Sequence, residues 1–330
     1  MNVLVLGGTG FLGLHVCRTL AEAGASVLQV SRTARSDPAP AQPGRITPMD
    51  HDLAGGGRPA LARLLADADA DVVVNAYGMA WSGTPAQMSE ANARWVGDLV
   101  DVMTALPRRP RLVQIGTVHE YGAMPVGTAA AEEHPARPVT AYGRTKLLGT
   151  RTVLRAAADG LDATVLRITN ACGPGAPRAS LLGSVAHHLV DAAERHADGE
   201  PPEPLVFPSL SAGRDFVDVR DAAEAALAAA RAPHGVATGR VVNIGGGRAA
   251  PVREAVARLV ALSAVPVPVS EDEPGAAAGP TRAEWQQVDI SLAAGLLGWR
   301  PRRDLDTSLN DQLTELRRDA GQREGPDRCV

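Results

Sequence analysis

The chain begins with a short apolar strand that leads at once into a glycine-rich turn and a helix. Residues 2–6 are mostly apolar, and Gly7, Gly10 and Gly13 then recur at every third position. The amphipathic run that follows starts at Phe11. Glycines at such a turn let the backbone approach a pyrophosphate, which the positive N-terminus of the helix attracts. This order of elements predicts a dinucleotide-binding unit at the start of the chain.

The rest of the chain alternates between strand-like and helix-like runs. We expect strands near residues 2–6, 26–31, 71–76, 111–116, 163–168 and 240–244. We expect helices near residues 11–23, 87–105, 140–158, 218–231 and 250–262. Such alternation is typical of a parallel sheet with helices on both faces. The predicted fold class is therefore α/β, a doubly wound parallel sheet of the Rossmann type with a smaller C-terminal lobe.

The composition changes after Pro174, where proline- and glycine-rich stretches interrupt shorter elements. Two such stretches lie at residues 199–208 and 266–280. They suit a loop-rich lobe that packs on a larger domain. We therefore expect residues 1–175 to form the dinucleotide-binding domain and residues 176–330 to form mainly a substrate-binding lobe.

Two parts of the second half are expected to behave differently from the lobe. Residues 213–248 are expected to return to the first domain, because Val241–Ile244 has the composition of a buried strand. The last eleven residues, 320–330, are polar and are expected to form a frayed tail.

A single lysine occurs in the 330 residues, against 32 arginines, and it stands four positions after Tyr142. Positions i and i+4 of a helix share a face, so the ammonium of Lys146 can lie beside the phenol. A nearby positive charge favours the phenolate and lowers the pKa of a tyrosine from its usual value of about 10. The pair therefore predicts a proton donor or acceptor that works near neutral pH.

Charge and cysteine content narrow the class of protein. The formal net charge is -4 and the pI about 6.1, with no basic stripe, so we expect no nucleic-acid partner. Three scattered cysteines fit a reducing cytoplasm and no metal cluster. No apolar run approaches the roughly 20 residues of a membrane span, and a glycine turn interrupts the first apolar segment. We expect a cytoplasmic protein without a membrane anchor or signal peptide.

With the glycine turn and the Tyr142/Lys146 pair, the chain resembles the extended branch of the short-chain dehydrogenase/reductase family, which modifies nucleotide sugars. The resemblance runs from residue 1 to about residue 305. Four further segments carry it: Ile115–Thr117, Leu166–Gly175 (with Cys172 where the family has tyrosine), Gly213–Asp221 and Gly298–Pro301. The resemblance implies an NAD(P)-dependent enzyme, closest in look to deoxysugar 4-ketoreductases.

The resemblance also implies roles for individual residues. Thr117, Tyr142 and Lys146 match the catalytic set. The positions that match cofactor contacts are Gly7, Thr9, Gly10, Phe11, Leu12, Gly13, Ser31, Arg32, Asp52, Leu53, Asn75, Ala76, Tyr77, Asn92 and Lys146. The positions that match substrate contacts are His119, Asn170, Arg214 and Arg282. A half-exposed loop position remains open for His119, and a surface position for Arg282.

The residues after the second predicted strand indicate which dinucleotide binds. Folds that prefer NAD place Asp or Glu there to bind the ribose hydroxyls, whereas this chain has Ser31 and Arg32, with Arg35 soon after. A hydroxyl beside a guanidinium suits a 2′-phosphate, because it offers charge-assisted hydrogen bonds. The prediction is NADP(H). The alternative is that both arginines are solvated loop charges.

The residues after Thr117 bear on the reaction. The 4,6-dehydratases of the family carry Thr-Asp-Glu there, whereas here Val118 and His119 follow and the carboxylate of Glu120 comes one position late. A slip of one residue at a strand end redirects a side chain, so dehydration is not expected. The favoured reaction is NADPH-dependent reduction of the C4 keto group of a TDP-linked 4-keto-6-deoxyhexose, in deoxysugar and antibiotic biosynthesis.

Two other functions remain open: a nucleotide-sugar epimerase with tightly bound NAD, and a non-catalytic NADP-binding sensor on the same fold. For the reductase and for the epimerase alike, the implied ligand is a nucleotide-diphosphate sugar. The resemblance also implies a homodimer, in which the helices near 87–105 and 140–158 pair across a two-fold axis to form a four-helix interface.

Overall fold

The computed structural model describes residues 1–32, 44–80, 83–197, 199–271 and 285–323. Within these residues, a seven-stranded parallel sheet forms the centre of the molecule, in the order β10-β6-β5-β4-β1-β2-β3. Its strands are β1 (Asn2–Leu6), β2 (Ser26–Ser31), β3 (Ile46–Asp50), β4 (Val72–Asn75), β5 (Arg111–Thr117), β6 (Ala163–Ile168) and β10 (Val241–Ile244). The chain runs outward from β1 in one direction and from β4 in the other. Ligands of such sheets bind where this reversal opens a crevice at the carboxyl ends of the strands.

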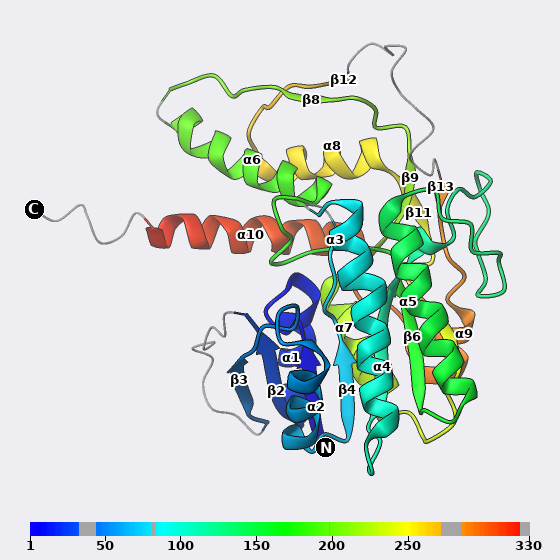
Figure 1. Cartoon of the computed structure of the whole chain (residues 1–330). Helices are drawn as coiled ribbons and strands as arrows, with labels where there is room; N and C mark the ends of the chain where they lie inside the picture. The colour runs from blue at the N-terminus through cyan, green and yellow to red at the C-terminus, as the bar shows by residue number, and fades with distance from the viewer. Residues whose placement is uncertain (33–43, 81–82, 198, 272–284, 324–330) are drawn as a thin grey trace, which may run out of the picture.

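Two hydrophobic layers cover the sheet, because successive side chains of a strand point to opposite faces. Val3 and Val5 of β1 pack in one layer, and Leu4 and Leu6 pack in the other. The first layer is completed by α1 (Phe11–Glu22), α7 (Val219–Arg231) and α9 (Ser291–Leu297). The second is completed by α2 (Gly57–Ala68), α4 (Trp95–Ala105) and α5 (Ala141–Ala158). Figure 1 shows these helices on the two sides of the sheet. The predicted doubly wound α/β fold is confirmed.

A smaller lobe lies beyond the carboxyl ends of the strands (Figure 1). Its helices, α6 (Leu181–Ala197), α8 (Val252–Ser263) and α10 (Leu305–Arg323), share a hydrophobic core. Strand β9 (Gly213–Asp218) pairs with β7 (Asn170–Cys172), β11 (Ala249–Pro251) and β13 (Trp285–Gln286). A separate pair consists of β8 (Leu205–Phe207) and β12 (Val269–Glu271).

Residues 213–248 contribute to both parts of the molecule. Strand β9 belongs to the small sheet of the lobe, whereas α7 packs on α1 and β10 pairs with β6 in the central sheet. The exact division of the chain at residue 175 stays a prediction. Among the described residues, no helix is long and apolar enough to cross a membrane, and no group of His, Cys, Asp and Glu is placed to hold a metal ion.

The structure contains elements that the sequence pattern did not predict. Strand β3 lies at the edge of the sheet, contains Pro48 and is partly exposed, so it lacks a continuous apolar run. Helices α2, α6, α9 and α10 were also not predicted. The expectation of a frayed tail over 320–330 is wrong for its first residues, because α10 extends to Arg323. Residues 324–330 lie outside the described part of the chain.

Candidate active site

The carboxyl end of β5 turns into a short 3-10 helix, η2 (Val118–Glu120). The hydroxyl of Thr117 accepts a hydrogen bond from the main-chain N–H of His119 at 3.4 Å, and the carboxylate of Glu120 accepts one from the N–H of Thr117 at 3.0 Å. This reciprocal capping holds Thr117 at the strand end and turns Glu120 back into the protein.

Glu120 is fully buried, and its partner is the equally buried Arg167 of β6. The guanidinium donates to one carboxylate oxygen at 2.8 Å, and it also lies 4.2 Å from the ring centre of Tyr121. Both oxygens of Glu120 are therefore engaged inside the protein. A carboxylate held in this way is not available as a free acid or base at the end of β5, and the expectation that dehydration is not the reaction stays a prediction.

Helix α5 brings the predicted tyrosine and lysine to the same place. Its cap is Thr140, whose side chain accepts a hydrogen bond from Gly143 N–H at 3.0 Å. A Cβ at Gly143 would lie 2.4 Å from the carbonyl oxygen of His119, so only glycine lets α5 start this close to η2. Tyr142 precedes Gly143 on α5, and its phenol lies near enough to the side chain of Thr117 for that side chain to lower its pKa.

Lys146 lies one turn further along α5 and is 8% exposed. Its Nζ donates to the carbonyl oxygen of Ile115 at 2.5 Å, and a Cβ at Gly78 would be 3.8 Å from the same nitrogen. Burial lowers the pKa of Lys146 to about 8, and the negative charge of Glu120 opposes this shift. The ammonium is thus enclosed between the end of β5 and the loop after β4.

The expected effect of Lys146 on the pKa of Tyr142 is not observed. Burial raises the pKa of Tyr142 to about 12, Glu120 adds to the rise, and the hydrogen bond with Thr117 opposes it. The prediction of a depressed tyrosine pKa is therefore wrong for this structure, because desolvation of the phenolate outweighs the favourable interactions. Tyr142 holds its proton throughout the neutral range.

Asn92 lies in a π-helical segment, η1 (Glu90–Arg94), between α3 (Pro85–Ser89) and α4. Its amide donates to Met79 O at 2.9 Å and to Thr145 Oγ1 at 3.2 Å, and it accepts from Met79 N–H at 2.9 Å. Such π-bulges often occur at functional sites. Here the bulge clamps the loop after β4 to α5; the predicted contact between Asn92 and the cofactor stays a prediction.

The glycine turn after β1 forms a cradle with no room for side chains. Gly7 adopts φ +78°, and a Cβ at Gly13 would lie 2.1 Å from Gly7 O. Helix α1 begins with Gly10 as its cap and without any side-chain hydrogen bond at that end. Thr9, Phe11 and Leu12, all partly exposed, complete the same turn. The residues present therefore fit the pyrophosphate of a dinucleotide.

Strand β2 ends at the two residues predicted to discriminate between the dinucleotides, Ser31 and Arg32. Ser31 is buried, and its hydroxyl oxygen has no hydrogen-bond partner within the described part of the chain, whereas the adjacent Arg32 is exposed. Arg35 lies outside the described residues.

The other predicted cofactor residues lie after β3 and after β4, and they differ in burial and in their hydrogen bonds. The ring of Tyr77 contacts that of Trp95 at 4.8 Å between centres, and Trp95 donates to Leu53 O at 2.7 Å. Asp52 is exposed, and its carboxylate caps the N–H of Ala54 at 3.0 Å. Asn75 is fully buried, and its side-chain oxygen accepts a hydrogen bond from Tyr77 N–H at 3.1 Å, which fixes the loop after β4. Ala76, between them, is partly exposed.

Three of the four predicted substrate residues lie around His119, which packs against Tyr142. The imidazole of His119 packs edge-on against the Tyr142 ring, with 5.7 Å between centres. Burial, and then the positive charge of Arg214, lower the pKa of His119 to about 4. Asn170, on β7, donates to Asp215 O at 3.0 Å. Arg282 lies outside the described residues.

Gln286 is a site residue that the sequence did not indicate. It is 1% exposed, accepts from the Asn170 amide at 3.2 Å and faces His119 Nδ1 at 3.4 Å. Both N–H groups of the Asn170 amide are engaged in these bonds, and its predicted contact with the substrate stays a prediction. No motif marks Gln286; the nearest predicted site residue in the sequence is Arg282, four positions earlier.

The carboxylate of Asp215 was also missed. It is fully buried and accepts from the N–H groups of Gly246 at 2.7 Å and Val288 at 3.2 Å. Burial raises its pKa to about 7 despite these bonds. Asp215 thereby joins the loop after β10 to the segment after β13, and holds the central sheet and the small sheet together next to Asn170.

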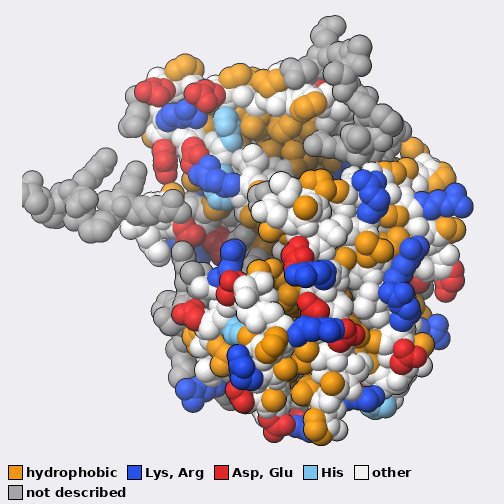
Figure 2. Space-filling model, viewed as in Figure 1, with side chains coloured by type: hydrophobic (Ala, Val, Ile, Leu, Met, Phe, Trp, Pro, Cys, Tyr) orange, Lys and Arg blue, Asp and Glu red, His pale blue; other side chains and the backbone are white. Residues whose placement is uncertain are grey.

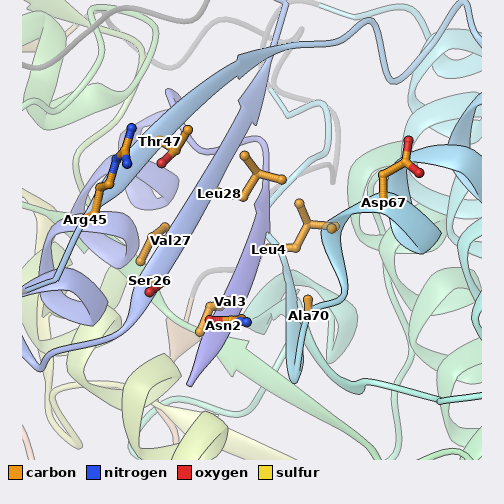
Figure 3. Close-up of a pocket in the computed structure, with 11 residues that line it drawn as sticks. Asn2, Val3, Leu4, Ser26, Val27, Leu28, Arg45, Thr47, Asp67 and Ala70 are labelled. Atoms are coloured by element: carbon orange, nitrogen blue, oxygen red, sulfur yellow. The ribbon is translucent and has the colours of Figure 1, made fainter.

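A cavity of about 260 Å³ lies away from these residues. Figure 3 shows its lining side chains, which come from the first half of β1 and β2, from the start of β3 and from the end of α2. It contains none of the predicted site residues. Because ligands of parallel α/β sheets bind at the opposite, carboxyl ends of the strands, we place the active site at Tyr142 and not in this cavity.

Comparisons with known proteins agree with this geometry. The model of the "NAD dependent epimerase/dehydratase family" matches residues 3–245. The chain is 41% identical over 317 residues to a dTDP-6-deoxy-L-talose 4-dehydrogenase (NAD(P)(+)) from Kitasatospora kifunensis, with 95% of each chain covered. It is 28% identical over 349 residues to a UDP-glucose 4-epimerase from Azospirillum brasilense, with 98% of this chain and 95% of the relative covered. The solved structure of MoeE5 in complex with UDP-glucuronic acid and NAD matches with a TM-score of 0.79 and 25% identity, and covers 97% of this chain and 100% of that one.

Proposed function

Because the chain belongs to the NAD-dependent epimerase/dehydratase family, we propose that it reduces the C4 keto group of a TDP-linked 4-keto-6-deoxyhexose with NADPH. One observation carries this proposal. Thr117, Tyr142 and Lys146 converge at the end of β5, while the nearby carboxylate of Glu120 is fully buried and paired with Arg167. Carbonyl reduction needs a proton donor at the oxygen and no second acid–base pair.

The proposed roles follow from the geometry. The dinucleotide, when bound, supplies the hydride that reaches C4. Tyr142 keeps its proton at neutral pH, because its pKa is about 12, and donates it to the developing alkoxide. Thr117 holds the tyrosine hydroxyl and, through it, the carbonyl oxygen. The buried ammonium of Lys146 contributes to binding of the nicotinamide ribose, and solvent returns the proton to Tyr142.

The relative from Kitasatospora kifunensis supports the substrate class. Its name describes oxidation at C4 of a dTDP-6-deoxyhexose with either dinucleotide, which is the reverse of the proposed reduction. We propose that Arg214 contributes to binding of the substrate diphosphate, for which a guanidinium is well suited. The setting we propose is cytoplasmic deoxysugar supply for a glycosylated metabolite.

NADPH is expected to bind more tightly than NADH, because the exposed guanidinium of Arg32, which follows Ser31 at the end of β2, suits a 2′-phosphate. Arg32→Asp should narrow or invert this preference, since a carboxylate repels the phosphate and accepts from ribose hydroxyls. Dissociation constants measured by fluorescence titration of both dinucleotides test this. Equal affinities in the unaltered protein would refute the assignment of NADP(H).

The reaction itself is tested by its stoichiometry. With a TDP-4-keto-6-deoxyhexose, the protein should consume one NADPH per product and yield a 6-deoxyhexose with a hydroxyl at C4. A reductase uses one hydride per product, whereas an epimerase returns it. If a 4-hydroxy nucleotide sugar is interconverted without net loss of NADPH, the epimerase function replaces this one; the UDP-glucose 4-epimerase relative makes it the second candidate.

We also propose a homodimer through α4 and α5. These helices pack side by side, and the outward face of α5 carries Leu148, which is 49% exposed, between the exposed Arg144 and Arg151. Figure 2 shows arginine side chains gathered over this helix. Light scattering at micromolar concentration should give twice the mass of 34.2 kDa. A monomeric mass would refute the dimer.

A further inference from the structure

Three polar side chains form a hydrogen-bonded chain that starts at a main-chain carbonyl. The carbonyl oxygen of Asp215 can only accept, so the NH₂ group of Asn170 must face it, and it does so at 3.0 Å. The second hydrogen of the same group reaches Oε1 of Gln286 at 3.2 Å. If Gln286 were turned over, two NH₂ groups would face each other. The orientation of both amides is therefore fixed.

The last hydrogen bond of this series, from Gln286 to His119, determines which imidazole nitrogen of His119 carries the hydrogen. Nε2 of Gln286 faces Nδ1 of His119 at 3.4 Å. An amide nitrogen only donates, so Nδ1 has to be the acceptor, and a neutral imidazole then carries its hydrogen on Nε2. Among the described residues the imidazole has no other hydrogen-bond partner. Its N–H is thus left for a bound molecule, beside the proton donor Tyr142.

We infer that Gln286 is a positioning residue that holds His119 as the Nε2–H tautomer, and that His119 uses this hydrogen to select a sugar with an oxygen, not an amino group, beside the reacting carbon. The selectivity rests on the proposed function, whereas the tautomer does not. An N–H can only donate, so an oxygen satisfies it. A protonated amine brings only donors, and it also meets the positive charge of Arg214.

The charged groups around His119 keep it neutral. Burial lowers its pKa to about 4, and Arg214 of β9 is near enough to add to this shift. Tyr142 of α5 keeps its proton, and Glu120, the next residue of η2, is paired with Arg167. On the β13 side, the facing group is the uncharged amide of Gln286. The imidazole is therefore a fixed hydrogen-bond donor across the neutral range.

The tautomer is tested without substrate or turnover. Long-range ¹H–¹⁵N correlation spectra of ¹⁵N-histidine-labelled protein distinguish the two tautomers, and His119→Gln identifies the signal among the eight histidines. We expect the Nε2–H pattern from pH 6 to 8. In Gln286→Glu the carboxylate can only accept, so the signal should change to the Nδ1–H or the charged form. Gln322→Glu, which adds the same charge on the exposed end of α10, should leave it unchanged. An Nδ1–H or charged imidazole in the unaltered protein would overturn the inference.

The selectivity is tested with two TDP-4-keto-6-deoxyhexoses that carry a hydroxyl or an amino group on the carbon next to the carbonyl. The unaltered protein should prefer the hydroxyl sugar in kcat/KM by on the order of tenfold or more, the effect of one hydrogen bond. His119→Gln retains an N–H donor and should keep most of the preference, whereas His119→Phe should lose it. If His119→Phe reduces both sugars with the original preference, the selectivity is refuted. If neither sugar is reduced by the unaltered protein, the proposed function and the selectivity fail together, and the spectra alone decide the role of Gln286.

Discussion

Lys146→Arg should lose turnover by ~10² or more while the protein still folds, in line with the usual contribution of general acid–base groups. The ammonium fits a narrow space between Ile115 O and Gly78, and it is 8% exposed. A guanidinium is a wide planar fork and cannot occupy that space in the same way. Steady-state rates of NADPH oxidation, together with a thermal unfolding curve for each protein, test this expectation.

Arg151→Lys is the matched control, because Arg151 is an exposed position on the same helix. It should leave both turnover and unfolding temperature close to those of the unaltered protein. Turnover of Lys146→Arg within a few-fold of normal would show that the lone lysine is incidental.

The pH profile gives an independent check of the same residue. Burial lowers the pKa of Lys146 to about 8, so the unaltered enzyme should lose kcat/KM as the pH rises through that value and the ammonium loses its proton. Below that pH Lys146 stays charged, and Tyr142 keeps its proton well above it. Arginine stays charged at every accessible pH, so the residual activity of Lys146→Arg should lack this alkaline loss.

Features that are local in sequence could be predicted, and features that join distant segments could not. The glycine turn and the i, i+4 pair of Tyr142 and Lys146 depend on residues a few positions apart, and the structure brings that pair to Thr117. Six strands of the central sheet could be predicted because each is an apolar run of residues. Strand β3 could not be predicted in this way, because it lies at the edge of the sheet and is mostly exposed.

The position of Gln286 depends on long-range pairing. β13 lies beside β9 in the register that sets Gln286 against Arg214, 72 residues earlier in the chain. The pKa of Tyr142 was mispredicted for a related reason. The neighbouring charge could be inferred from the helix, but the extent of burial, which decides the sign of the shift, is set by η2 and by the packing around it.

Glu120→Gln should destabilise the protein by about 3–5 kcal/mol, the usual result of removing one partner of a buried ion pair. Glu120 is fully buried and Arg167 is 3% exposed, so the guanidinium that remains cannot recover its solvation from water. The amide also loses one of the acceptors that bind Arg167 and Thr117 N–H. Urea unfolding of the variant and the unaltered protein measures the difference.

The exposed pair of Arg178 and Asp191 offers a matched control, since both side chains are about half exposed or more, at 61% and 49%. Asp191→Asn should change the free energy of unfolding by at most about 1 kcal/mol, because water screens and resolvates an exposed pair. Adding Arg167→Met to Glu120→Gln removes the unpaired charge and should restore part of the lost stability. If Glu120→Gln lowers the free energy of unfolding by no more than Asp191→Asn does, the Glu120–Arg167 pair does not stabilise the end of β5. Glu120 would then not be held away from a bound substrate by this pair.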